Sequence, residues 1–216
     1  MFDYNMAFSM NRFVKYLILS DLFFWSAWGL VSPLFAIFVV DKIEGGSLLV
    51  VGIASGIALV LKSVLRIPIG IFIDKFDGEK DDYFCLVIGL FIAALTAFGF
   101  IFASKVWHIY LLQALQGIGV AVSLSAWSPI FSRHIDDKKR ALEWGLDATA
   151  IGVGTGVTSI IGSWAVARFG FDSVFFCVGV IGIVGALILL PIKKDVQKEK
   201  TPGLTFSFKD IFTNNK

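Results

Sequence analysis

Six long apolar runs dominate this 216-residue sequence, and they constrain its fold more than any other feature. Each run reaches the roughly 20 residues that a helix needs to cross the hydrocarbon core of a bilayer. They are too long for the strands of a membrane barrel, and the first is too long for a signal-peptide core. The sequence therefore predicts an all-α integral membrane protein, with transmembrane helices at residues 16–40, 48–73, 84–103, 106–131, 142–167 and 173–192.

Composition and charge support this topology and orient it. Hydrophobic residues make up 56% of the chain and charged residues 17%, which leaves too little polar surface for a soluble domain. If the N-terminus is cytoplasmic, the inner segments hold 14 Lys and Arg residues and the outer segments hold 3. Because cytoplasmic loops are enriched in Lys and Arg, both termini are predicted to face the cytoplasm, in a multi-pass protein of the plasma or inner membrane.

Three regions follow from the same pattern. Residues 1–15 are expected to form a cytoplasmic N-terminus, residues 16–192 the six-helix bundle, and residues 193–216 a cytoplasmic tail or linker. The last boundary lies where the apolar sequence gives way to a lysine-rich stretch just after Pro191.

Several function classes lack support in the sequence. It has no His-Glu-x-x-His, Gly-x-Ser-x-Gly or Walker motif, so we expect no enzyme activity and no cofactor. Cys85 and Cys177 lie inside apolar runs without a second ligand cluster, which argues against a metal site or a disulfide framework. The net charge of +2 is not gathered on a basic face, so nucleic acid is not an expected partner. A channel is not favoured, because the sequence shows no selectivity-filter loop or ring of like charge, and a non-transporting scaffold or assembly protein stays open as an alternative.

The end of the second predicted helix carries a distinctive pattern. Gly70 is followed after three residues by Asp74 and Lys75, and then by Gly78 and Lys80. This segment resembles the signature loop of the major facilitator superfamily, which has a Gly, three residues, an Asp, a basic residue, and then a Gly with further basic residues. In this sequence the second glycine of the pattern, Gly78, lies one position later than in the family. The pair of basic residues that ends the pattern is represented by Lys80 alone.

Two further stretches agree with that resemblance. Residues 113–119 resemble the family pattern Arg-x-x-Gln-Gly-x-Gly, with Gln113 where Arg is usual, and residues 139–142 and 162–171 are similar to the pattern around the fifth helix. The resemblance extends over residues 16–191, and residues 206–212 look like the lead-in to a seventh helix. It implies one six-helix half of a twelve-helix transporter that moves a small solute by alternating access.

Four charged residues within the predicted helices are candidates for binding or coupling. Lys62 and Arg66 lie four residues apart and therefore share a helix face. Charges in hydrocarbon are rarely left unpaired, so the two cations are expected either to bind an anionic solute or to form structural ion pairs. Asp21 and Asp147 lie at a depth similar to that of Arg66 and are the candidate partners. Asp21 could alternatively carry a proton or serve a structural role near the interface.

Aromatic and amide residues on the first and fourth predicted helices are candidates for a solute cavity. The resemblance implies that these two helices line the cavity, which directs attention to Trp25, Trp28, Gln113 and Trp127. For any one tryptophan, apolar packing or lipid contact is the alternative. Gln113 in place of Arg argues against the proton-coupled drug antiport known in the family.

The resemblance also implies a second six-helix unit, because six helices cannot enclose a central pathway in this family. An even number of spans lets two identical copies pair around a two-fold axis along the membrane normal, so we expect a homodimer. The rival reading is the N-terminal half of a twelve-helix transporter. In the homodimer, Asp74 of one copy is expected to approach the start of the partner's fifth helix, near residues 141–145. These residues are assigned to a cytoplasmic gating loop: Gly70, Asp74, Lys75, Lys80 and Arg140.

Overall fold

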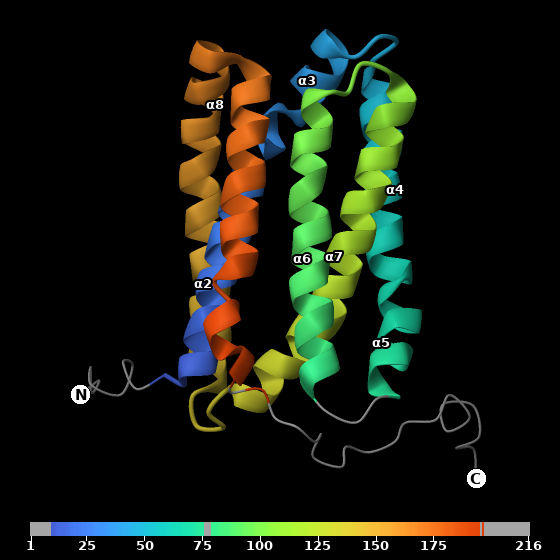
Figure 1. Ribbon diagram of the computed structural model, residues 1–216. Helices are drawn as coiled ribbons and strands as arrows, with labels where there is room; N and C mark the ends of the chain where they lie inside the picture. Colours follow the sequence, from blue (N-terminus) through green and yellow to red (C-terminus); the bar gives the residue numbers. More distant parts are fainter. Residues whose placement is uncertain (1–9, 76–78, 195, 197–216) are drawn as a thin grey trace.

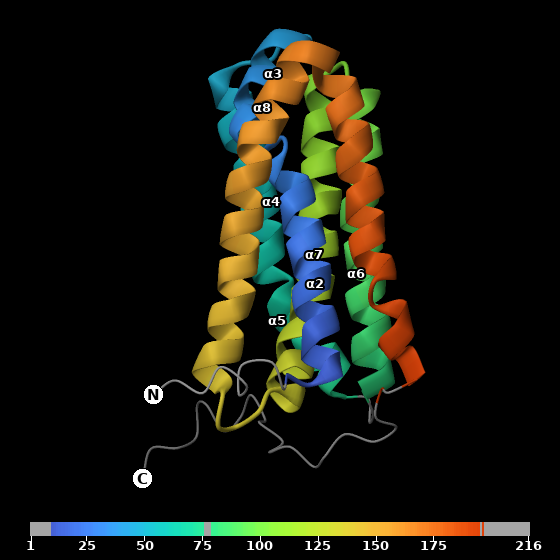
Figure 2. The same ribbon diagram turned by 90° about the vertical axis from the view of Figure 1, so that its left-hand side faces the viewer.

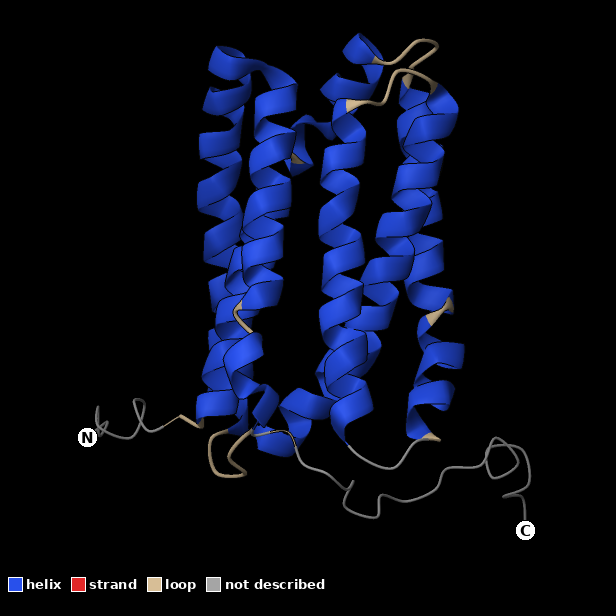
Figure 3. Ribbon diagram, viewed as in Figure 1, coloured by secondary structure: helices blue, strands red, loops and turns tan. Residues whose placement is uncertain are grey.

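The computed structural model describes residues 10–75, 79–194 and 196, and in these residues the fold is entirely helical (Figures 1 and 3). One isolated bridge, between Glu44 and Lys105, joins two turns. The predicted all-α fold is therefore confirmed. The elements are α2 (Arg12–Gly29), η1 (Ser32–Leu34), α3 (Phe35–Lys42), α4 (Leu48–Val64), α5 (Arg66–Asp74), α6 (Glu79–Ile101), α7 (Val106–His134), α8 (Arg140–Leu187) and η2 (Leu190–Lys194).

Five helical stretches in the described part of the chain are long and apolar enough to cross a membrane, and the last of them crosses twice. A straight helix of the 48 residues of α8 would measure about 72 Å, more than twice the hydrocarbon thickness of about 30 Å. The chain instead reverses at Gly170, whose φ of 80° and ψ of 171° are accessible mainly to glycine. The two legs of α8, residues 140–169 and 171–187, run in opposite directions on either side of α2, which gives the six predicted spans (Figures 1 and 2).

Local sequence features place the starts and breaks of the helices. The Asn11 side chain accepts a 3.0 Å hydrogen bond from the Phe13 N–H, so α2 begins at Arg12, four residues before the predicted span. Pro33 lies in the 3-10 turn that separates α2 from α3. Pro68 has no N–H to donate to the carbonyl of Val64, and Val64 is where α4 ends before α5 continues the same span.

Close backbone approaches hold α2 against both legs of α8. A Cβ atom at Gly162 would collide with the Leu30 carbonyl, and one at Gly154 would collide with the Ser26 hydroxyl. On the second leg, the Ser20 hydroxyl donates a 2.8 Å hydrogen bond to the Gly185 carbonyl. Small residues let helices approach closely in a membrane, where the hydrophobic effect does not drive their association. The same device joins α4 to α7, where Gly117 lies against the backbone of Ala58.

The end of the bundle where α2 begins is closed by a buried ionic network. Arg133, at the end of α7, pairs with Asp82 and lies 3.3 Å from Glu79, both on the first turn of α6. The two carboxylates are almost fully buried, with exposures of 0% for Asp82 and 1% for Glu79. We call this the basic end, because α2, α5, α6, α7 and α8 begin or finish here with most of the basic residues of the described helices (Figure 1).

The close approach at Gly162 generates a stability prediction. Gly162→Ala should destabilise the bundle by about 1–3 kcal/mol, because the added methyl group forces α8 away from the Leu30 carbonyl. Ser173→Ala is the control on the other leg of α8, since Ser173 is exposed and its hydroxyl bonds only to the Phe169 carbonyl of its own helix. That variant should change the stability by no more than about 0.5 kcal/mol. Thermal unfolding in detergent would measure both variants, and equal effects would contradict this account of the packing.

Candidate functional site

A cavity of about 310 Å³ lies on the side of the bundle where α2, α4, α7 and the first leg of α8 converge. Its volume suits a small solute. Its lining combines aromatic rings with neutral amide and hydroxyl groups and includes no charged residue: Trp25, Trp28, Gly29, Val31, Ser32, Phe35, Ser55, Gln113, Gln116 and Thr155.

Helical spacing brings the key lining groups together. Trp25 and Trp28 are three residues apart on α2, and Gln113 and Gln116 are three apart on α7, so each pair shares one helix face. The Trp28 ring is fixed edge-on to Phe100, with 6.5 Å between the ring centroids. The indole Nε1 of Trp28 is buried and finds no hydrogen-bond partner among the described residues. The cavity can therefore stack a solute against indole rings and offer it amide hydrogen bonds.

Trp127 does not line this cavity, although it lies on α7 like the two glutamines. It stacks on Phe131 with ring centroids 4.6 Å apart, and its ring lies 5.6 Å from that of Trp144 on α8. Its residue is 6% exposed. These contacts make Trp127 part of the packing between α7 and α8 nearer the basic end.

The two intramembrane acids lie near each other. Asp21 on α2 and Asp147 on the first leg of α8 are each 6% exposed, where the two helices pack together. Within the described ranges no ion pair joins either acid to Lys62 or Arg66, the partners that depth alone allowed. Among the residues that the structure describes, no group of three His, Cys, Asp or Glu side chains is arranged to hold a metal ion.

Lys62 and Arg66 lie on the cavity side of the α4–α5 span. Lys62 follows Ser55, a lining residue, by seven residues, which is two helical turns, and Arg66 follows Lys62 by one more turn. Lys62 is half-buried and Arg66 is exposed. Both cations therefore lie on the same face as the cavity, displaced from it toward the basic end.

The residues assigned to the gating loop lie at the basic end. Asp74 is the last residue of α5, and Lys75 follows it; both are exposed. Lys80, in the first turn of α6, and Arg140, the first residue of α8, are exposed as well, and Arg140 forms a 2.6 Å ion pair with Asp137. Gly70 on α5 has no atom within 4 Å of the position of a Cβ. Gly78, the displaced glycine of the motif, lies outside the described residues.

Six glycines flank the cavity on two faces that nothing in the described chain covers. A Cβ atom at any of them would meet no other atom within 4 Å. Three lie on the α4–α5 span and three on the first leg of α8: Gly52, Gly56 and Gly70, and Gly145, Gly152 and Gly156. Of these six glycines, only Gly70 stood out in the sequence, as part of the signature-loop pattern.

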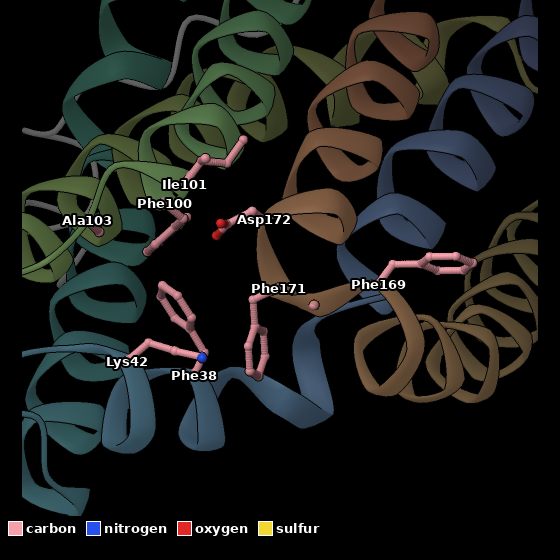
Figure 4. Close-up of a pocket in the computed structure, with 9 residues that line it drawn as sticks. Phe38, Lys42, Phe100, Ile101, Ala103, Phe169, Phe171 and Asp172 are labelled. Carbon is pink, nitrogen blue, oxygen red and sulfur yellow. The ribbon is translucent and has the colours of Figure 1, made fainter.

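A second cavity, of about 290 Å³, lies at the opposite end of the bundle from the basic end (Figure 4). Figure 4 shows Phe169 pointing away from it, so Phe38, Phe100 and Phe171 provide its aromatic wall. The charged side chains of Lys42 and Asp172, both exposed, complete the lining. None of the candidate binding, coupling or gating residues from the sequence lines this cavity.

Comparison with known proteins identifies the fold and the family. The sequence model described as Major Facilitator Superfamily matches residues 17–215. An uncharacterized MFS-type transporter of Methanocaldococcus jannaschii is 29% identical over 197 residues, covering 87% of this chain and 49% of the relative. The inner membrane transport protein YajR of Escherichia coli is 24% identical over 149 residues, covering 68% of this chain and 31% of the relative.

A solved structure has the same fold. The POT family transporter PepTSo superposes with a TM-score of 0.72 at 17% identity, over 89% of this chain and 39% of that one. The chain thus spans about half or less of the length of these relatives. With nearly the whole sequence matched by the family model, this chain belongs to the major facilitator superfamily of membrane transporters, as a half-size, six-helix domain.

Proposed function

We propose that this chain is a secondary active or facilitative transporter that moves a small solute by alternating access, as a homodimer of six-helix halves. The cavity lined by Trp25, Trp28, Gln113 and Gln116 carries this proposal. It lies on the uncovered side of the bundle, its lining carries the amide groups of two glutamines, and its volume suits a small molecule.

The exposure of the α4–α5 span supports a second copy. Only 11% of its most apolar segment is buried, against 44% in the most apolar segment of each of the other four helical stretches. Together with the first leg of α8, it presents the uncovered glycine faces, which suit close approach by another helix. Two copies related by a two-fold axis along the membrane normal would place the α4–α5 span of each against α8 of the other and close the cavities between them.

A charge contact at the basic end would hold such a dimer closed toward the cytoplasm. Asp74 is exposed at the end of α5, and the second turn of α8 is open at Gly145. A carboxylate at a helix N-terminus gains about 0.3–1 kcal/mol when exposed and up to about 2 kcal/mol when partly buried. The two-fold axis makes this contact twice, and it would break when the pathway opens inward. The excess of Lys and Arg assigns the basic end to the cytoplasm.

The cations below the cavity favour an anionic solute. Lys62 and Arg66 project from the cavity side of the α4–α5 span, and among the described residues neither forms an ion pair. An anionic group on a solute held in the cavity would provide the counter-charge that such residues need within a membrane.

Alternating access can be tested without knowing the solute. In a background with Cys85→Ala and Cys177→Ala, Ser55→Cys should react with a membrane-impermeant thiol reagent added from either side of the membrane. The reason is that Ser55 lines a cavity that would open to each side in turn. Ser123→Cys is the matched control, because Ser123 is 3% exposed in the helix packing and should react from neither side. Reaction of Ser55→Cys from only one side would contradict alternating access.

The dimer contact can be tested by crosslinking. In the same cysteine-free background, a chain with Asp74→Cys should form a disulfide with a second chain that carries Leu142→Cys. Asp74→Cys with Ile161→Cys is the control pair, because Ile161 lies about 28 Å farther along α8. Equal crosslinking of both pairs, or none with Leu142→Cys, would count against the proposed contact.

Charge selectivity can be tested by uptake into proteoliposomes. For whichever small anion is taken up, Lys62→Gln and Arg66→Gln should each reduce transport about tenfold or more, since a hydrogen bond to a charged group contributes about 1.5–3 kcal/mol. Lys105→Gln, at the opposite end of the bundle, should leave uptake unchanged. Uptake restricted to cations would rule out the anionic assignment.

A further inference from the structure

The cavity of about 290 Å³ at the end of the bundle opposite the basic end carries one charge of each sign on its lining (Figure 4). We call it the outer cavity. Lys42 is the last residue of α3, and Asp172 lies at the start of the second leg of α8, just after the reversal at Gly170. Figure 4 shows the Lys42 ammonium and the Asp172 carboxylate pointing into the same space from these two elements.

The two charges of the outer cavity are not used by the fold. Within the described residues no ion pair joins Lys42 to Asp172, and neither side chain pairs with another charge. Both residues are exposed, so a molecule can approach them from the aqueous side. Asp41, Glu44 and Lys105 lie at the same end of the bundle but do not line the cavity. The cavity therefore offers an incoming molecule one cation and one anion.

An aromatic wall lies beside the two charges. Phe38, Phe100 and Phe171 line the cavity and are buried, with exposures of 3%, 1% and 9%. The ring centroid of Phe38 lies 6.1 Å from that of Phe100 and 5.3 Å from that of Phe171. Because each ring is packed against another, the wall is in place before a ligand arrives. Such ring faces suit an apolar or aromatic group of a ligand.

The outer cavity is separate from the proposed solute cavity, although the two are neighbours. No residue lines both of them. Trp28 and Phe35 line the solute cavity, and both rings lie edge-on to Phe100 of the outer cavity, with centroid distances of 6.5 Å and 5.9 Å. Aromatic side chains therefore stand between the two cavities, and a molecule in the outer cavity would occupy a site of its own.

We propose that the outer cavity binds a small zwitterion with a bulky apolar body, such as an amino acid with an aromatic side chain. The Lys42 ammonium donates hydrogen bonds to the carboxylate of the ligand, and the Asp172 carboxylate accepts hydrogen bonds from its ammonium group. The apolar body lies against the aromatic wall. A molecule with a single charge would engage only one of the two residues. This site goes beyond the proposed transport function, because its equilibrium occupancy requires no transport.

Equilibrium binding to the purified protein in nanodiscs, measured by calorimetry without any gradient, tests the site. The probe is L-phenylalanine, which carries both charges and an aromatic body. Its matched analogues are phenylpropionate, which lacks the ammonium group, and phenylethylamine, which lacks the carboxylate. The wild-type protein should bind L-phenylalanine about tenfold or more tightly than either analogue, because each analogue gives up the hydrogen bonds to one charged residue.

Two variants identify the residues. Lys42→Gln should weaken the binding of L-phenylalanine about tenfold and bring it level with phenylethylamine, which has no carboxylate for Lys42 to bind. Asp172→Asn should bring L-phenylalanine level with phenylpropionate for the corresponding reason. A purely structural role would not change the selectivity in this way. Lys105→Gln and Glu44→Gln are the matched controls, because both residues are exposed at the same end without lining the cavity, and both variants should keep the wild-type affinities.

Equal binding of the three compounds by the wild-type protein, or no binding of L-phenylalanine, would overturn the proposal. So would binding that is lost in Lys62→Gln and unchanged in Lys42→Gln, because the probe would then lie on the side of the solute cavity. If a variant fails to fold, the comparison of the three compounds on the wild-type protein decides. The labelling of Ser55→Cys tests alternating access independently, so the failure of one proposal is distinguishable from the failure of the other.

Discussion

The rest of the structure depends on the glycine-mediated contact between α2 and the two legs of α8. In a membrane, helices associate through close packing and interhelical hydrogen bonds. Gly162 brings the first leg against the Leu30 carbonyl, and Gly185 brings the second leg within reach of the Ser20 hydroxyl. Because α2 also carries Trp25, Trp28 and Asp21, this contact sets the position of the cavity wall and of the acid pair.

The bundle is packed unevenly, and its proposed function follows from this asymmetry. Its closed side is built from α2, α6 and the second leg of α8, whose glycines meet neighbouring backbones or side chains. The α4–α5 span and the first leg of α8 turn their glycines toward open space, with the solute cavity between them. A face of small residues beside a polar cavity is suited to a second bundle that must both seal the pathway and slide against it.

The fold was predictable because helix length and apolarity are local properties, whereas the site depends on how the helices are rotated. The six apolar runs gave the spans, but the start of α2 at Arg12 depended on an Asn11 cap outside the apolar pattern. Depth along the helices allowed Asp21 and Asp147 to meet Arg66, whereas the packing of α2 on α8 brings the two acids near each other instead. For the same reason the sequence could not exclude Trp127 from the cavity, since rotation of α7 turns it toward Trp144.

The central claim is that the uncovered face is completed by an identical copy of the chain. Native mass spectrometry of the protein released from nanodiscs tests this most directly, because it counts chains without assuming which residues touch. The account predicts a particle with twice the 23.7 kDa mass of one chain. A particle with the mass of a single chain, under conditions that preserve the fold, would contradict it.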